Sequence, residues 1–275
     1  MSTLYDQMLA SYDRHSEQAR HNAACEVCQQ VALAGLSQGG FFDKAAFYGG
    51  TCLRIFHGLQ RYSEDMDFTL LRPDSSFDFS RYFQPIIDEF SAVGRQVEIR
   101  KKEKNTLSRV ESAFLKDNTD IYDLRFQAVK SIKIKIEVDT RPPLDFDTDY
   151  QLMLQPRSVM VRCLKLPCLF AGKLHALLFR TWKKRIKGRD WYDFEWYIRH
   201  DVPVSLRHLQ ARIREFNDIE LTDDDIRLLI RKLFTTTDIH LVRQDVLPFI
   251  RNANQLDIWS RDYFLALADK LRFTD

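Results

Sequence analysis

A glycine turn placed between a short strand and a helix constrains the fold of this chain more than any other feature. Residues 46–48 have the composition of a buried strand, Gly49-Gly50 follows directly, and residues 51–56 have the apolar spacing of a helix. Glycine lets the backbone approach a ligand closely, and the free N–H groups of a helix N-terminus attract phosphate oxygens. Gly49, Gly50 and Thr51, whose hydroxyl can cap the helix or donate to a ligand, are therefore candidate nucleotide-binding residues. A tight turn without a ligand is the alternative.

Two aspartates open the next predicted strand. Residues 67–71 are rich in aromatic and β-branched side chains, and side chains two apart in a strand project from the same face. Asp65 and Asp67 would repel each other there unless a divalent cation lies between them. Mg²⁺, or Mn²⁺ in its place, suits such a site, because Mg²⁺ takes one or two carboxylates and completes its shell with water and phosphate oxygens. The alternative is a polar turn that leads into a solvated strand face.

A third acidic position lies on the clearest strand of the sequence. Apolar and charged residues alternate through residues 131–139, which places Lys133, Lys135, Glu137 and Asp139 on one face and the aliphatic residues on the other. A site with two metal ions needs a further carboxylate from a neighbouring strand. We expect Glu137 to supply it, with Asp139 as the alternative. Many faces of this kind are only the solvated side of an antiparallel sheet.

A second cluster of charged residues follows later in the chain. Residues 171–180 have helical spacing, so Lys173 and Arg180 fall close to one line along the helix. Lysine can meet triphosphate oxygens as a point charge, whereas Arg180 or Arg189 can bind them in a planar fork. Asp190 and Asp193 share a helix face and can hold Lys173 in place or contact the second substrate. The alternative is a solvated pair of helices with ordinary salt bridges.

The glycine turn, the two aspartates and Glu137 together resemble the signature of the polymerase-β-like nucleotidyltransferase superfamily. Within it, the chain is similar to the AbiEii/AbiGii toxin family, as residues 61–68, 171–180 and 187–194 indicate. The resemblance implies an α+β fold, in which a mixed nucleotidyltransferase sheet precedes a helical C-terminal lobe and the nucleotide binds between the lobes. It also implies that Lys173, Asp190 and Asp193 belong to the active site.

The same resemblance implies an activity. The chain would be a nucleotidyltransferase toxin that transfers NMP from an NTP to an acceptor, such as tRNA or another RNA, with Mg²⁺. Asp65, Asp67 and Glu137 would bind the metal ions. It would belong to a toxin–antitoxin system for phage defence and have a separate antitoxin protein as partner. A non-catalytic nucleotide-binding module, for GTP among others, and a kinase-like phosphotransferase toxin that releases nucleoside diphosphate are the alternatives.

Charge and cysteine content agree with a cytoplasmic protein that has no membrane partner. The net charge is +2, no run of eighteen apolar residues exists, and the five cysteines fit a reducing compartment better than a disulfide framework. Cys25 and Cys28 have zinc-ligand spacing within a predicted helix, so a structural zinc is a minor alternative. The basic residues 183–189, flanked by Trp182 and Trp191, have the mixture of cations and aromatic rings that binds RNA.

The remaining patterns predict a catalytic domain at 1–160 and a helical domain at 161–275. Residues 1–35 and 77–93 read as helices, and residues 96–102, 109–114 and 123–129 as strands, the last of which forms a hairpin with the strand at Lys133. Pro142-Pro143 would end the sheet, because proline lacks the donor that a central strand needs. Thr222 is expected to cap a helix. The following residues are expected to form core stripes of the helical domain: Leu228, Leu229, Leu233, Phe264, Leu265, Leu267, Ala268 and Leu271.

Overall fold

The computed structural model describes residues 2–102, 119–126, 132–179 and 186–275. These divide into two compact units. The first comprises residues 1–58, 62–142 and 148–163, and the second comprises residues 59–61, 143–147 and 164–275. Each unit therefore draws on segments that are far apart in the sequence. The predicted strand at 109–114 lies outside the described residues.

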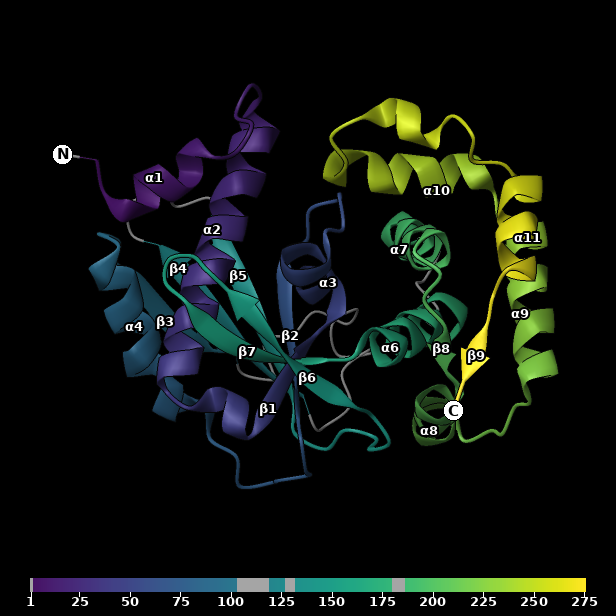
Figure 1. The fold of residues 1–275 in the computed structure, drawn as a ribbon, viewed down its shortest axis with the longest axis horizontal. Helices are drawn as coiled ribbons and strands as arrows, with labels where there is room; N and C mark the ends of the chain where they lie inside the picture. Colours follow the sequence, from purple (N-terminus) through teal and green to yellow (C-terminus); the bar gives the residue numbers. More distant parts are fainter. Residues whose placement is uncertain (1, 103–118, 127–131, 180–185) are drawn as a thin grey trace. The chain divides into compact units, whose positions relative to one another are not determined.

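The first unit is built on a mixed sheet (Figure 1). Among the described residues, seven strands join in the order β3-β4-β5-β2-β1-β7-β6. The α+β fold is as expected. The strands are β1 (Ala45–Tyr48), β2 (Asp65–Leu70), β3 (Val97–Lys101), β4 (Thr119–Phe126), β5 (Lys133–Asp139), β6 (Thr148–Met153) and β7 (Val159–Leu164).

The pairing of the strands confirms one prediction and corrects another. β4 and β5 are antiparallel neighbours, as the expected hairpin requires. Pro142-Pro143 does not end the sheet, because β7 returns to its other side and pairs in parallel with β1. The prolines lie between β5 and β6, and the strands that follow them join the sheet beyond β1.

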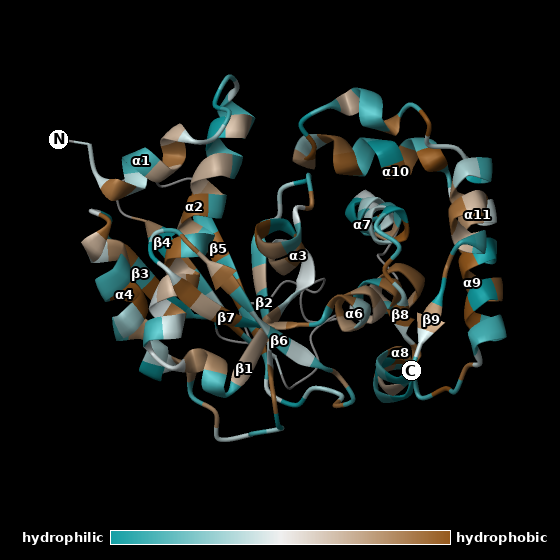
Figure 2. Ribbon diagram, in the orientation of Figure 1, coloured by the Kyte–Doolittle hydropathy of each residue, from teal (hydrophilic) through white to brown (hydrophobic). Residues whose placement is uncertain are grey.

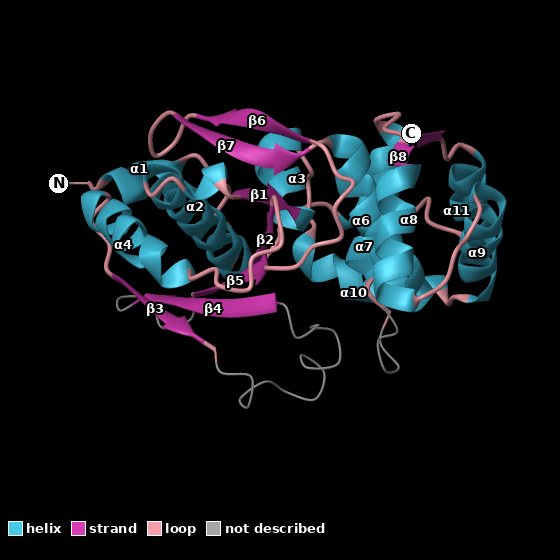
Figure 3. Ribbon diagram, turned by 90° about the horizontal axis from the view of Figure 1, so that it is seen from below, coloured by secondary structure: helices cyan, strands magenta, loops and turns pink. Residues whose placement is uncertain are grey.

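Helices α1, α2 and α4 lie together on one side of this sheet (Figure 3). The helices of the first unit are α1 (Leu4–Ala10), α2 (Glu17–Gln38), α3 (Gly49–His57) and α4 (Phe83–Ala92), with 3-10 turns at Phe41–Asp43 and Phe79–Tyr82. The single helix expected for residues 1–35 is in fact two, because the Ser16 side chain accepts from the Ala19 amide and starts a new helix there. The apolar face of β5, with Ile134, Ile136 and Val138, is fully buried, as predicted.

The second unit is mainly helical, as expected after residue 166. Its helices are α6 (Leu166–Phe179), α7 (Gly188–Arg199), α8 (Leu206–Asn217), α9 (Asp223–Thr236), α10 (Ile239–Val246) and α11 (Arg261–Asp269), with 3-10 turns at Leu247–Phe249 and Ala253–Leu256. Two short strands, β8 (Val204–Ser205) and β9 (Phe273–Thr274), pair in parallel. No helix in the described ranges has the length and apolar content that a membrane span needs.

The helix α9 has a hydrophilic and a hydrophobic side (Figure 2). Thr222 caps it in a reciprocal arrangement with Asp225, which confirms the predicted cap. The expected core stripe is wrong at Leu228, which is 68% exposed, whereas Leu229 and Leu233 are half-buried. The fully buried residues of α9 are Ile226, Ile230 and Phe234. In α11 and beyond, Phe264, Leu267, Ala268 and Leu271 are buried as expected, and Leu265 is only partly so.

Candidate active site

The turn from β1 into α3 brings Gly49 against Asp67. Gly49 has φ +82°, in the left-handed region that favours glycine, and a Cβ added there would overlap the Asp67 carboxylate. Tyr48 lies opposite Asp67 in the antiparallel pair of β1 and β2, which explains the close approach. The sequence order of strand, glycine turn and helix is confirmed. The start of α3 and the Asp67 carboxylate therefore lie side by side.

The Thr51 side chain forms a hydrogen bond within the protein. Its hydroxyl donates a hydrogen bond to the backbone carbonyl of Asp65, and its side chain is fully buried. The expected cap is wrong in detail, because α3 begins at Gly49 and has Tyr48 at its N-cap position, without a side-chain cap. Thr51 thus ties the first turn of α3 to the start of β2, where Asp65 begins the strand.

Side chains of α2 bond to α3 and to the residues that precede β2. Gln29, buried, donates from its amide to the carbonyls of Ser63 and Glu64, at 3.0 and 3.1 Å. Glu26 accepts from Arg54 of α3 at 2.8 Å, and both side chains are about nine-tenths buried. Because these groups are removed from water and paired, they fix α3 and the entry to β2 in one arrangement.

The carboxylates of β2 and β5 share one face of the sheet. The two strands are parallel, and the register pairs Asp65 with Lys135 and Asp67 with Glu137. Asp139 pairs with Thr69, farther along, and accepts from the Arg141 amide at 3.0 Å. Glu137 is therefore the carboxylate directly across from Asp67. Like charges in such a cross-strand pair repel each other.

Lys135 relieves this repulsion. Its ammonium forms an ion pair with Glu137, and the two side chains are 24% and 22% exposed. Burial lowers the pKa of Lys135, but the Glu137 carboxylate, followed by Asp65 and Asp67, raises it, and the net pKa lies above its ordinary value. The lysine is thus a positively charged member of the carboxylate cluster.

Asp65 and Asp67 fit a Mg²⁺ ion by their chemistry. They present hard oxygen ligands from one strand face, and the remaining positions of the shell are those that water and substrate phosphates fill. Within the described ranges, no three or more acidic, histidine or cysteine side chains form a ready-made metal site. The Glu137 carboxylate is paired with Lys135 instead. Cys25 and Cys28 of the zinc alternative are buried in α2 as free thiols.

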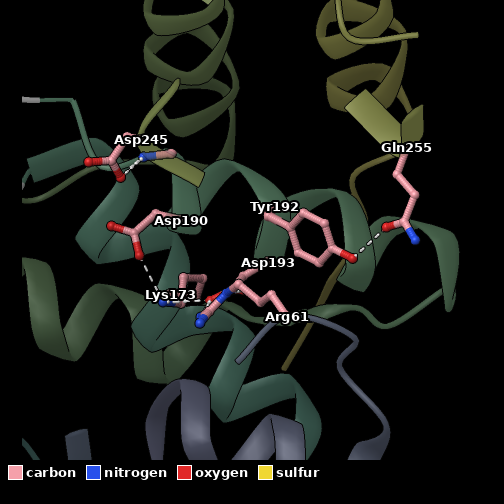
Figure 4. Close-up of polar contacts among 8 residues, drawn as sticks. Arg61, Lys173, Asp190, Tyr192, Asp193, Asp245 and Gln255 are labelled. Carbon is pink, nitrogen blue, oxygen red and sulfur yellow. Dashed lines mark hydrogen bonds and ion pairs between the residues drawn. The ribbon is translucent and has the colours of Figure 1, made fainter. Parts of the chain in front are cut away.

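The charged residues predicted in the second unit form a buried ionic network (Figure 4). Lys173 of α6 contacts Asp190 and Asp193 of α7, each at 2.8 Å. Arg61 donates to both carboxylate oxygens of Asp193 at 2.6 Å. Asp193 is completely buried, and Asp190 is 2% exposed. The alternative of a solvated helix pair is therefore wrong, because these charges are removed from water.

The network is electrically balanced. Burial raises the pKa of Asp193, but the charges of Arg61 and Lys173 lower it by more. The net pKa therefore lies below its ordinary value. Two cations thus face two carboxylates in this part of the second unit. Removing either kind of partner would leave a buried charge without its counter-ion.

The start of α7 is fixed by close packing on α10. The Gly188 amide donates to Asp245 at 2.8 Å, and a Cβ at Gly188 would overlap the carbonyl oxygen of Val242. Arg189 places its guanidinium over the Phe249 ring, with 4.0 Å between its Cζ atom and the ring centroid. The Tyr192 hydroxyl donates to Gln255 at 3.0 Å. These contacts fix the position of α7, the helix that carries Asp190 and Asp193.

One expectation from the sequence is wrong here, and another concerns residues outside the described ranges. Trp191 does not offer a ring to a nucleic-acid base, because it is 3% exposed and packs against Phe234 and Phe264. Arg180, expected to bind nucleotide, lies outside the described residues, as do Trp182 and the basic residues 183–185.

Sequence reasoning missed several residues that support these groups. Arg61 lies in a motif of the sequence, but nothing in its spacing points to Asp193, far along the chain. Glu26 and Gln29 looked like ordinary polar positions of a helix. Lys135 is placed by the alternation on the same strand face as Glu137, two residues before it, but that pattern does not show that the two form an ion pair.

Comparisons with known proteins agree with this architecture. The family model described as "Nucleotidyl transferase AbiEii toxin, Type IV TA system" matches residues 31–275. A comparison with curated proteins finds no match. The structure is similar to MenT4, a nucleotidyltransferase toxin from Mycobacterium tuberculosis H37Rv, with TM-score 0.61 and 17% identity over 98% of this chain and 89% of that one.

Two proteins of Helicobacter pylori have a similar fold. JHP933 gives TM-score 0.52 and 18% identity over 92% of this chain and 91% of that one. A candidate nucleotidyltransferase gives TM-score 0.51 and 17% identity over 92% of this chain and 94% of that one. At these identities the likeness concerns the fold, whereas the family match extends over most of the sequence. The chain belongs to the AbiEii family of nucleotidyltransferase toxins.

Proposed function

We propose that this protein transfers a nucleoside monophosphate from an NTP to a hydroxyl group of an RNA acceptor, in a reaction that depends on Mg²⁺. The observation that carries the proposal is the position of Asp67, which lies against Gly49 at the start of α3 and across from Glu137. A helix N-terminus suits phosphate oxygens, and the carboxylates suit the cation that accompanies them. Family membership supports the toxin role.

The residues of the first unit have distinct parts in this reaction. Asp65 and Asp67 would hold the metal ion, and the N–H groups at Gly49 and Gly50 would receive phosphate oxygens. Glu137 would help to bind the cation or take the proton of the acceptor hydroxyl. The bond from the acceptor oxygen to the α-phosphorus forms as the bond to the bridging oxygen breaks, and pyrophosphate leaves. A bound metal ion would neutralise charge on the phosphates.

Lys173 contributes to triphosphate binding in this proposal, with Asp190 and Asp193 as the groups that orient it and Arg189 as a further cation. Their buried network supports the orienting role, because the Lys173 ammonium is fixed by two carboxylates. The RNA acceptor, tRNA in particular, the antitoxin partner, the role in phage defence and the cytoplasmic location rest on family membership alone.

The test is a transfer assay with each α-³²P-labelled NTP, Mg²⁺ and total cellular RNA. The intact protein is expected to label a discrete RNA band and release pyrophosphate, whereas Asp65→Ala/Asp67→Ala does neither. Circular dichroism of the variant checks that the fold is kept. Equal labelling by the variant would refute the assigned site. Release of nucleoside diphosphate would favour a phosphotransferase, and nucleotide binding without turnover would favour a binding module.

A further inference from the structure

Lys135 occupies a special place in the carboxylate cluster of the first unit. It lies directly across from Asp65 in the register of β2 and β5, and two residues before Glu137, with which it forms an ion pair. Neighbouring strands are about 4.8 Å apart, and positions two apart in a strand are about 6.6 Å apart. Asp65, Asp67 and Glu137 are therefore the three carboxylates nearest to this ammonium on β2 and β5.

A second lysine of β5, Lys133, forms its ion pair with a different carboxylate. Lys133 pairs with Asp123 of β4 at 2.9 Å, and Arg125 lies 3.8 Å from the same carboxylate. Asp123 of β4 is directly across from Lys135, yet its carboxylate forms ion pairs with Lys133 and Arg125. The two lysines thus divide the acidic groups, and Lys135 is directed toward the cluster that contains Asp67.

We infer that Lys135 is the counter-ion that neutralises the Asp65, Asp67 and Glu137 cluster before a metal ion binds, and that it must release Glu137 when the cation enters. This inference rests on the proposed function, because it takes Asp65 and Asp67 as the metal ligands. A monovalent ammonium and a divalent cation compete for the same carboxylates, and their like charges repel at this separation. Lys135 therefore weakens metal binding while it stabilises the metal-free protein.

The experiment measures Mn²⁺ binding directly, by titration calorimetry and by the electron paramagnetic resonance signal of free Mn²⁺, without nucleotide. Lys135→Met is expected to bind Mn²⁺ about tenfold more tightly than the intact protein and to melt at a lower temperature in EDTA. Lys135→Arg, which keeps the charge, should bind as the intact protein does. Lys133→Met is the matched control, because it removes a lysine from the same face of β5.

Asp67→Asn separates this inference from the proposed function. If Asp67→Asn binds Mn²⁺ as the intact protein does, the assigned metal site is wrong, and the role of Lys135 falls with it. If Asp67→Asn loses binding while Lys135→Met binds Mn²⁺ with unchanged or weaker affinity, the metal site stands and the Lys135 inference is overturned. Should Lys135→Met not fold in EDTA, refolding in Mn²⁺ with wild-type helicity would support the inference, and a failure to refold would overturn it.

Discussion

The buried network around Asp193 should contribute strongly to the stability of the second unit. Asp193 accepts two hydrogen bonds from Arg61 and contacts Lys173, and its side chain is completely buried. Asp193→Ala would leave the Arg61 guanidinium, only 3% exposed, without this carboxylate. Loss of one partner of a buried pair costs about 3–5 kcal/mol. We expect the free energy of unfolding of this unit to fall by about that amount.

Tryptophan fluorescence is a suitable assay, because Trp191, Trp196 and Trp259 lie in the second unit and no tryptophan precedes residue 182 in the sequence. Urea denaturation would be followed at 25 °C for the intact protein and the variant. Asp269→Ala is the matched control, because Asp269 pairs with Arg231 at the surface and is 65% exposed. Removing an exposed pair of this kind changes stability by less than about 1 kcal/mol.

A second substitution should reverse part of this loss. Adding Arg61→Met to Asp193→Ala should recover part of the lost stability, because the stranded cation is removed together with its partner. If Asp193→Ala lost no more than Asp269→Ala, the ionic network would not hold the second unit together. If that small loss of stability came with weaker nucleotide binding, Asp193 would have a role in substrate binding and none in stability.

Three other changes test separate parts of the structure. Gly49→Ala should reduce Mn²⁺ affinity and transfer at least tenfold, because its Cβ would overlap the Asp67 carboxylate and its φ is +82°; an unchanged titration would contradict this arrangement. Lys173→Ala should weaken triphosphate binding and turnover together, measured by equilibrium dialysis and the transfer assay on folded protein; unchanged values would leave Lys173 a structural role only. Burial, followed by the charge of Arg212, lowers the pKa of His208 to about 3. Below about pH 6.5 the unfolded chain therefore binds a proton at this histidine that the folded protein does not, and the free energy of unfolding falls as the pH drops. Between pH 7 and pH 5 this costs about 2 kcal/mol, and His208→Gln should lose less by that amount in urea titrations; an equal loss would exclude His208 as the source.

The local elements that carry the first unit's site could be predicted from the sequence. The alternation through residues 133–139 and the glycine turn at Gly49 depend on neighbours in the chain, and local steric and hydrophobic preferences decide them. For the same reason Asp65 and Asp67 were expected on one strand face, and Thr222 as a helix cap. Patterns that depend on which helix face meets the core were less secure, as the exposed Leu228 shows.

Tertiary structure decided which charges meet. The sequence determined that Lys135 and Glu137 share a face, but only the parallel register of β2 and β5 placed Asp65 and Asp67 across from them. Arg61 donates to Asp193, and Gln29 donates to the carbonyls before Asp65, although these partners are far apart in the chain. Pairings of this kind follow from the packing of whole elements, because a buried charge is tolerated only where the fold brings it a partner.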